Sequence, residues 1–129
     1  MSETKGVSRD EERLQYQLEE LQQRASKDSV SGLLNRATVE QYIKKRLQKM
    51  TAEEQCALFV IDLDNFKQVN DTLGHQAGDQ AIRQSARILS GLFRANDIVG
   101  RLGGDEFTVF LCGDITEEYV RKKAAQICD

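Results

Sequence analysis

The heptapeptide Arg101–Phe107 constrains the fold of this chain most, because it places a Gly-Gly pair between two apolar runs. Such a pair predicts a tight antiparallel hairpin, since both central residues of the turn take positive φ. Asp105 and Glu106 follow the glycines directly, so two carboxylates are expected at the exposed end of the hairpin. Glycine at this position also lets a ligand approach the backbone closely.

A second pair of carboxylates follows the apolar run at residues 56–61. The run shows no polar alternation, which predicts a central strand with both faces buried. Asp62 and Asp64 come next, at the end of a strand where open α/β folds place ligand chemistry. They could simply end the strand and cap the next helix. Because a period of two puts them on one side of the strand, we favour convergence on a cation.

Helical patterns account for most of the remaining sequence. In residues 9–26 the apolar positions repeat at spacings of four, three and four, which is the seam of a coiled coil (Leu14, Leu18, Leu21 and Ala25). An amphipathic helix folded onto its own domain and a parallel dimer stalk both fit this pattern. Further helices are expected at 37–50, 65–70, 79–93 and 116–129, with Asp79 and Thr116 as N-caps.

Composition excludes several classes of protein. The 129 residues suit one small domain. A net charge of −3 without a basic face disfavours a nucleic acid polymer as partner, whereas a single nucleotide held by metal remains compatible. No apolar run approaches the roughly 20 residues of a membrane span. Three cysteines without metal-ligand spacing predict free thiols in a reducing cytoplasm.

Several motifs in unbroken order resemble the GGDEF family of diguanylate cyclases. They are Asp28…Gly32-Leu33…Asn35-Arg36, Asp62-Leu63-Asp64-Asn65-Phe66-Lys67, Asn70-Asp71, Gly74-His75, Gly78-Asp79 and Arg101–Phe107. The resemblance implies a palm-like α/β fold, an α+β sandwich with helices flanking a central sheet, as in nucleotidyl cyclases. It divides the chain into an N-terminal helical or coiled-coil linker at 1–27 and a GGDEF domain at 28–129.

The resemblance also implies a reaction. Members of this family condense two GTP molecules into cyclic di-GMP and release two pyrophosphates, with Mg²⁺ or Mn²⁺ as cofactor. Each subunit of a homodimer holds one GTP, and each 3′-hydroxyl attacks the α-phosphorus of the opposite nucleotide. Cyclic di-GMP is then both the product and a possible inhibitor.

Carried over onto this sequence, the family's metal site consists of Asp62, Asp105 and the main-chain carbonyl of Leu63. Glu106 would assist the metal site or activate the 3′-hydroxyl, which makes Asp105 and Glu106 the expected catalytic pair. Both assignments suit phosphoryl transfer, which depends on positioning and on neutralising charge with metal ions.

The same resemblance assigns the nucleotide contacts. Asn70 and Asp79 would bind the guanine edge, Lys67 would contact phosphate, and Gly103 and Gly104 would let the nucleotide lie against the hairpin.

Arg94 and Asp97 form an Arg-x-x-Asp pattern before the hairpin. Taken alone, they could be a surface ion pair that contributes little to stability. The resemblance favours an allosteric site that binds the product cyclic di-GMP and inhibits the enzyme.

Family members continue past the last predicted helix with another strand and a final helix. The resemblance places that strand beside 56–63, whose edge would otherwise be open to pairing with another chain. We therefore expect weak or no cyclase activity from these 129 residues alone. The alternative is a non-catalytic module that binds GTP or cyclic di-GMP, or that dimerises in signalling.

Overall fold

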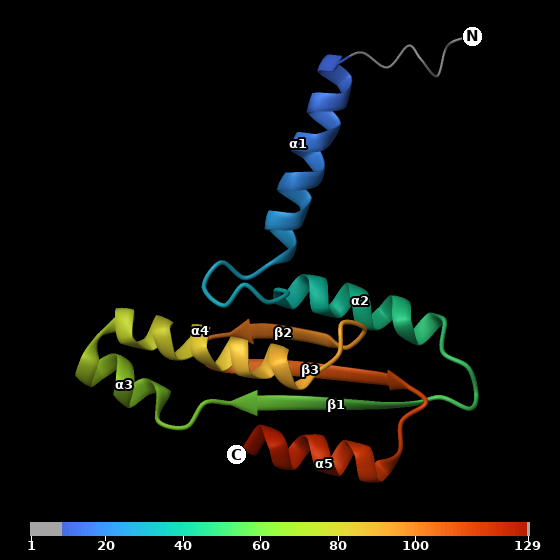
Figure 1. Ribbon diagram of the computed structural model, residues 1–129. Coiled ribbons are helices and arrows are strands. Elements are labelled where there is room, and N and C mark those ends of the chain that lie inside the picture. The colour runs from blue at the N-terminus through green and yellow to red at the C-terminus, as the bar shows by residue number, and fades with distance from the viewer. Residues whose placement is uncertain (1–8, 129) are drawn as a thin grey trace.

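The computed structural model describes residues 9–128 of the chain (Figure 1). Within these residues, five helices and three strands follow one another: α1 (Arg9–Ser26), α2 (Arg36–Gln48), β1 (Gln55–Asp62), α3 (Phe66–Leu73), α4 (His75–Leu92), β2 (Ile98–Gly103), β3 (Glu106–Gly113) and α5 (Glu117–Cys128). This arrangement of helices around an antiparallel sheet confirms the predicted α+β class.

The sheet has the strand order β1-β3-β2, and both strand pairs are antiparallel. Side chains of a strand alternate between the two faces. On one face, Phe107 packs against α4, and Val109 and Leu111 pack against residues of α5. On the other face, Phe110 packs against Val39 of α2. The central strand β3 therefore carries most of the core, with helices on both sides.

Strand β1 lies at an edge of this sheet, so the prediction of a central strand buried on both faces is wrong for the described residues. Its side chains at Leu58 and Val60 are each 58% exposed. They share the face that α2 covers, but α2 packs over Ile98 and Phe110 of the neighbouring strands. A continuous apolar run indicates that each of its residues favours burial. It does not indicate which strands and helices lie beside the run to bury them.

Helix α4 begins four residues earlier than expected, at His75, and Asp79 lies inside it. The prediction that Asp79 caps the helix is therefore wrong. Gly74, with φ of 92°, ends α3 and starts α4 with no side-chain cap. Thr116 does cap α5 as predicted, because its Oγ1 accepts a hydrogen bond of 3.1 Å from the backbone N–H of Tyr119.

Helix α1 projects away from the body formed by the sheet and the other helices (Figure 1). None of its side chains is buried, and the seam residues Leu14, Leu18 and Leu21 are 55 to 64% exposed. Of the two interpretations of its seam, folding of α1 onto its own domain is therefore wrong. Of the helices within residues 9–128, not one combines the length and apolarity needed to span a membrane.

Candidate active site

The hairpin turn consists of Gly104 and Asp105, since β2 ends at Gly103 and β3 begins at Glu106. Gly103 pairs with Glu106 after a register shift that follows Arg101. Both glycines take positive φ, 145° at Gly103 and 50° at Gly104. The predicted hairpin is therefore present, but the irregular register moves its centre by one residue and places Asp105 within the turn.

The turn lies against the end of β1, which brings the expected metal-site residues together. Asp62 is the register partner of Glu106. The backbone N–H of Leu63 donates to the carbonyl oxygen of Asp105 at 3.2 Å. Asp105 is half-buried, whereas Asp62 and Glu106 are exposed. Three carboxylates and the Leu63 main chain thus gather at one end of the sheet.

This donor set fits a hard divalent cation. Carboxylate and main-chain carbonyl oxygens are the ligands that Mg²⁺ prefers, and Mg²⁺ usually keeps several waters or substrate phosphates as well. Within residues 9–128, no group of three or more His, Cys, Asp or Glu side chains forms a ready metal cluster. A cation bound here would take only a few protein oxygens and would complete its coordination with water or phosphate oxygens.

The prediction that Asp62 and Asp64 lie on one side of a strand is wrong. It required a strand through both residues, but β1 ends at Asp62 and a turn follows. Asn65, in the next position, has a positive φ of 61°. The strand period therefore does not extend to Asp64.

The residues expected to bind guanine lie on two consecutive helices. Asn70 is in α3 and Asp79 is in α4, and the two helices are joined only by Gly74. Gly78 is buried against the Asn70 amide, and a Cβ there would collide with Asn70 Oδ1. Asp79 lines an open groove of about 520 Å³. The expected phosphate contact, Lys67, is exposed near the start of α3.

Arg94 and Asp97 form a turn between α4 and β2. The Asp97 carboxylate is only 7% exposed and accepts a hydrogen bond of 2.8 Å from the backbone N–H of Arg94. The Arg94 guanidinium is 66% exposed and lies 5.3 Å from the ring centroid of Tyr119. Asp97 thus stabilises the turn, while the Arg94 side chain remains accessible. Sequence spacing gave no sign of Tyr119.

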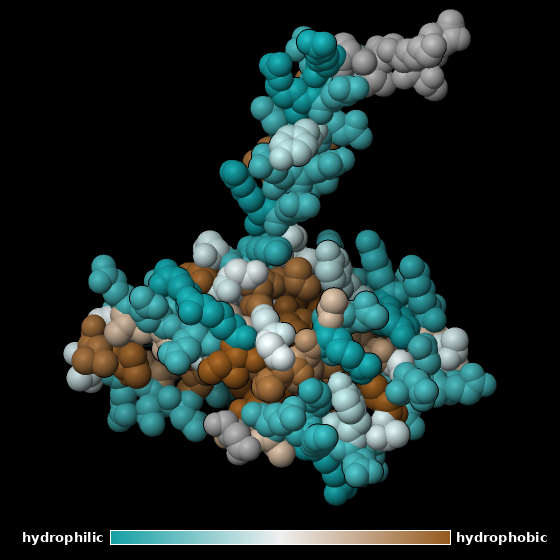
Figure 2. Space-filling view, in the orientation of Figure 1, coloured by the Kyte–Doolittle hydropathy of each residue, from teal (hydrophilic) through white to brown (hydrophobic). Residues whose placement is uncertain are grey.

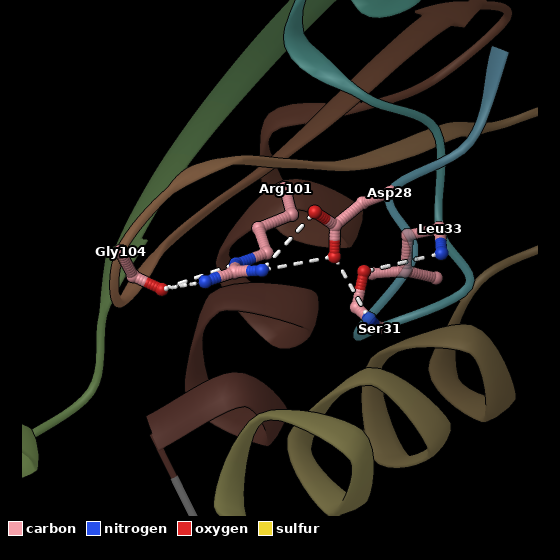
Figure 3. A network of polar contacts seen from close by, with 5 residues as sticks. All are labelled: Asp28, Ser31, Leu33, Arg101 and Gly104. Atoms are coloured by element: carbon pink, nitrogen blue, oxygen red, sulfur yellow. Dashed lines mark hydrogen bonds and ion pairs between the residues drawn. The ribbon is translucent and has the colours of Figure 1, made fainter. Parts of the chain in front are cut away.

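A contact that the sequence analysis missed joins the segment before α2 to the hairpin (Figure 3). Arg101 donates to the Asp28 carboxylate at 3.0 and 3.1 Å and to the carbonyl oxygen of Gly104 at 2.8 and 3.1 Å. Burial alone would raise the pKa of Asp28, but hydrogen bonds from Ser31 and Arg101 outweigh it, and the pKa is lowered. Asp28 and Arg101 are 73 residues apart, so no local pattern pairs them.

Residues 25–128 match the family model for the diguanylate cyclase GGDEF domain. The chain belongs to the GGDEF family of diguanylate cyclases. The general reaction of this family is the condensation of GTP to cyclic di-GMP, and the family is generally metal-dependent.

Individual relatives agree with this assignment. The chain is 43% identical over 95 residues to the probable diguanylate cyclase DgcE of Escherichia coli (strain K12), covering 73% of this chain and 9% of DgcE. It is 43% identical over 100 residues to the diguanylate cyclase TpbB of Pseudomonas aeruginosa (strain UCBPP-PA14), covering 77% of this chain and 23% of TpbB. This GGDEF chain thus spans less than a quarter of either relative.

Solved structures of GGDEF domains have a fold similar to that of this chain, and two examples illustrate it. The GGDEF domain of TpbB from Pseudomonas aeruginosa superposes with a TM-score of 0.72 at 38% identity, covering 78% of this chain and 59% of that one. The coiled coil and GGDEF domain of DgcB from Caulobacter crescentus, in complex with c-di-GMP, gives a TM-score of 0.77 at 29% identity. That match covers 90% of this chain and 61% of the other.

Proposed function

We propose that this GGDEF chain is the GTP-binding and catalytic part of a cytoplasmic diguanylate cyclase that uses Mg²⁺ or Mn²⁺. The observation that carries the proposal is the meeting of β1 with the hairpin turn, where Asp62 faces Glu106 and Leu63 bonds to Asp105. Asp62, Asp105 and the Leu63 carbonyl would hold the cation. When bound, the cation would neutralise phosphate charge during attack on the α-phosphorus.

Each remaining residue has a proposed role in binding the nucleotide. Asn70 and Asp79 recognise the guanine edge, because an Asp and an Asn offer the acceptors that guanine N–H groups require. Lys67 contacts phosphate from the start of α3. Glu106, exposed beside Asp62, assists the metal site or accepts the proton of the 3′-hydroxyl.

The reaction needs two such chains, since each site would hold one GTP and the two must face each other. The exposed seam of α1 supports a homodimer joined through this helix. A module that only binds nucleotide or dimerises would show the same seam, so turnover has to be measured separately from binding.

Titration calorimetry with GTP and Mg²⁺ tests the site. Asp105→Ala should lower GTP affinity at least tenfold without a change in melting temperature, because a half-buried turn residue contributes little to the core. Asp114→Ala is the matched control, since Asp114 is an exposed aspartate beyond the opposite end of β3. Equal affinity in wild type and Asp105→Ala would exclude the metal assignment.

Turnover is followed as cyclic di-GMP formed from GTP and Mg²⁺. We expect weak or no product from the 129 residues alone, because β1, which ends at Asp62, is an edge strand that pairs only with β3 among the described residues. Robust product formation would contradict that expectation. GTP binding with no turnover in any longer form of the protein would favour the non-catalytic module.

The Arg-x-x-Asp turn is the proposed product site. Its support is the accessible Arg94 guanidinium beside an open groove of about 640 Å³ that Arg94 and Asp97 help to line. Arg94→Ala should weaken cyclic di-GMP binding at least tenfold in calorimetry and leave GTP binding unchanged. Arg87→Ala, which removes another exposed arginine, should change neither.

A further inference from the structure

The turn that carries Asp105 contains Gly104 and follows Gly103, and these two glycines have little conformational preference of their own. Gly103 and Gly104 both have positive φ, and glycine adopts several such conformations at similar cost. A two-residue turn flanked by glycine can therefore exchange conformers by rotating a single peptide group. Something outside the turn has to select the conformer in which Asp105 faces the end of β1.

Arg101 supplies that selection through the carbonyl of Gly104. Its Nε and Nη2 atoms donate to this oxygen at 3.1 and 2.8 Å, and its side chain is 13% exposed. Because a peptide group is planar, fixing the Gly104 carbonyl also fixes the direction of the Asp105 N–H. On the far side, the Asp105 carbonyl accepts from Leu63. The Asp105 backbone is thus held from both sides.

Arg101 is itself held by Asp28. The remaining nitrogen, Nη1, donates to both carboxylate oxygens, and Asp28 Oδ2 also accepts from the backbone N–H of Ser31 at 2.8 Å (Figure 3). The planar guanidinium offers donors in a rigid fork, so it binds the carboxylate and the carbonyl at the same time. Lysine has a single flexible amine and does not reproduce this geometry.

The segment that contains Asp28 lies directly on β2. The backbone N–H of Arg101 donates to the carbonyl of Leu34 at 2.9 Å. A Cβ at Gly100 would lie only 2.8 Å from the Leu34 carbonyl oxygen, which shows how closely the segment approaches the strand. The Asn35 side chain in turn donates to Ala25 in the last turn of α1 at 2.6 Å. Hydrogen bonds therefore connect the end of α1 to the hairpin without a gap.

We propose that Arg101 is a positioning residue for the candidate site, which selects the turn conformer that presents Asp105. Asp28 keeps the guanidinium in place, so the segment joining α1 to α2 is coupled to the turn. The consequence for nucleotide binding rests on the function proposed above. The coupling itself is a property of the protein without nucleotide and is tested without it.

Amide hydrogen exchange of the nucleotide-free chain, followed by NMR, tests the coupling. The Leu63 N–H is the reporter, because it bonds to the Asp105 carbonyl. Arg101→Lys should speed its exchange at least tenfold and leave the amides of Ile82 and Ala86 in α4 unchanged. Arg121→Lys alters an exposed Arg–Glu pair, 78% and 76% exposed, and should have no effect. Unchanged Leu63 exchange in Arg101→Lys would overturn the proposal, as would equal acceleration in α4.

A double-mutant cycle tests whether Asp28 acts through Arg101. Asp28→Asn should also speed Leu63 exchange, and it can still accept the Ser31 hydrogen bond. In the Arg101→Lys background, Asp28→Asn should change the exchange rate of the Leu63 amide less than twofold further, because the effects of two contacting residues are not additive. Full additivity would overturn the role assigned to Asp28.

Calorimetry with GTP and Mg²⁺ then measures the consequence for the site. Arg101→Lys should weaken GTP binding about tenfold, and Arg121→Lys should not. If the wild-type chain binds no GTP, the proposed function fails, and the exchange experiment still decides the coupling. If the Arg101→Lys variant binds GTP as tightly as the wild-type chain although its Leu63 amide exchanges faster, positioning of the site by Arg101 is overturned.

Discussion

At the scale of single residues, the candidate site depends on a close approach that only glycine permits. Gly78 is buried in α4, and the Asn70 amide occupies the space that a side chain there would need. The two residues proposed to bind guanine, Asn70 and Asp79, are therefore kept adjacent by the absence of a Cβ between them. Glycine inside a helix lowers the stability of the fold by roughly 0.5–1 kcal/mol relative to alanine. At Gly78 this loss accompanies the close approach of the Asn70 side chain.

Gly78→Ala should displace the Asn70 side chain, lower GTP affinity about tenfold, and reduce the preference for GTP over ATP. The reason is that a recognition group pushed out of place leaves guanine N–H groups unpaired. Calorimetry with both nucleotides measures the change. Gly91→Ala in the same helix is the control, because nothing lies within 4 Å of its added Cβ. This variant should keep its GTP affinity and raise the free energy of unfolding by roughly 0.5–1 kcal/mol. Unaltered GTP affinity in a folded Gly78→Ala variant would contradict the role of Asn70.

At the scale of elements, β1 is half covered. Its side chains at Phe59 and Ile61 pack against the core formed with β3 and α5, whereas Leu58 and Val60 on the other face remain exposed. Figure 2 shows how apolar side chains gather on the body of the domain, in contrast to the largely polar surface of α1. Within the described part of the chain, strand β1 is therefore stabilised by hydrogen bonds to β3 alone and by the packing of only one of its two faces.

The reactivity of the Cys56 thiol, at the start of β1, depends on this partial burial. Burial, together with a hydrogen bond to Cys112 on β3, raises the pKa of the Cys56 thiol to about 11. The stability that accompanies the protonated thiol is present below pH ~9 and is lost as the pH rises through about 11. The folded thiol should therefore react slowly at neutral pH, since the thiolate is the nucleophile.

Alkylation by iodoacetamide at pH 8, followed by mass spectrometry, measures this reactivity. Cys56 should react at least tenfold more slowly than the exposed Cys128 in the folded chain, and at the same rate in urea. Its rate in the folded chain should keep rising with pH up to about 11. A Cys56 rate equal to that of Cys128 in the folded chain would show that β1 opens from β3.

At the scale of the whole molecule, α1 has no role in the core of the domain that follows it. Its seam of leucines stays exposed, yet hydrogen bonds join its last turn to the segment that holds Arg101. A helix with an uncovered apolar stripe gains stability when a second helix covers it. The molecule therefore has a projecting helix with an exposed apolar seam, which is connected to the hairpin and which the proposed homodimer would use.

Leu18→Asp should convert a homodimer into a monomer at micromolar concentration. Burying one leucine contributes about 1.5–3 kcal/mol, and a dimer loses two, so affinity should fall roughly a hundredfold or more. Analytical ultracentrifugation measures the mass. Gln23→Asp adds the same charge on the opposite side of the heptad and should leave the dimer intact. A wild-type chain that is already monomeric at this concentration would remove α1 from the proposed mechanism.

The sequence alone determined the class of the fold, the family, the hairpin and the order of the helices, because these follow from local periodicity and from motifs of contiguous residues. Leucine spacing identified α1, and the Gly-Gly pair identified the turn to within one residue. The same local signals failed where a neighbour decides the outcome. They placed β1 in the centre of a sheet and made Asp79 a helix cap.

Only the tertiary structure decided which distant residues meet. It paired Asp62 with Glu106, placed Asn70 against Gly78, and left Leu58 exposed. The link between Asp28 and Arg101 has no sequence signature at all, since each residue alone is an ordinary charged side chain. Local pattern states what each segment prefers, whereas the support of the Asp105 turn depends on a contact across 73 residues that exists only after the chain has folded.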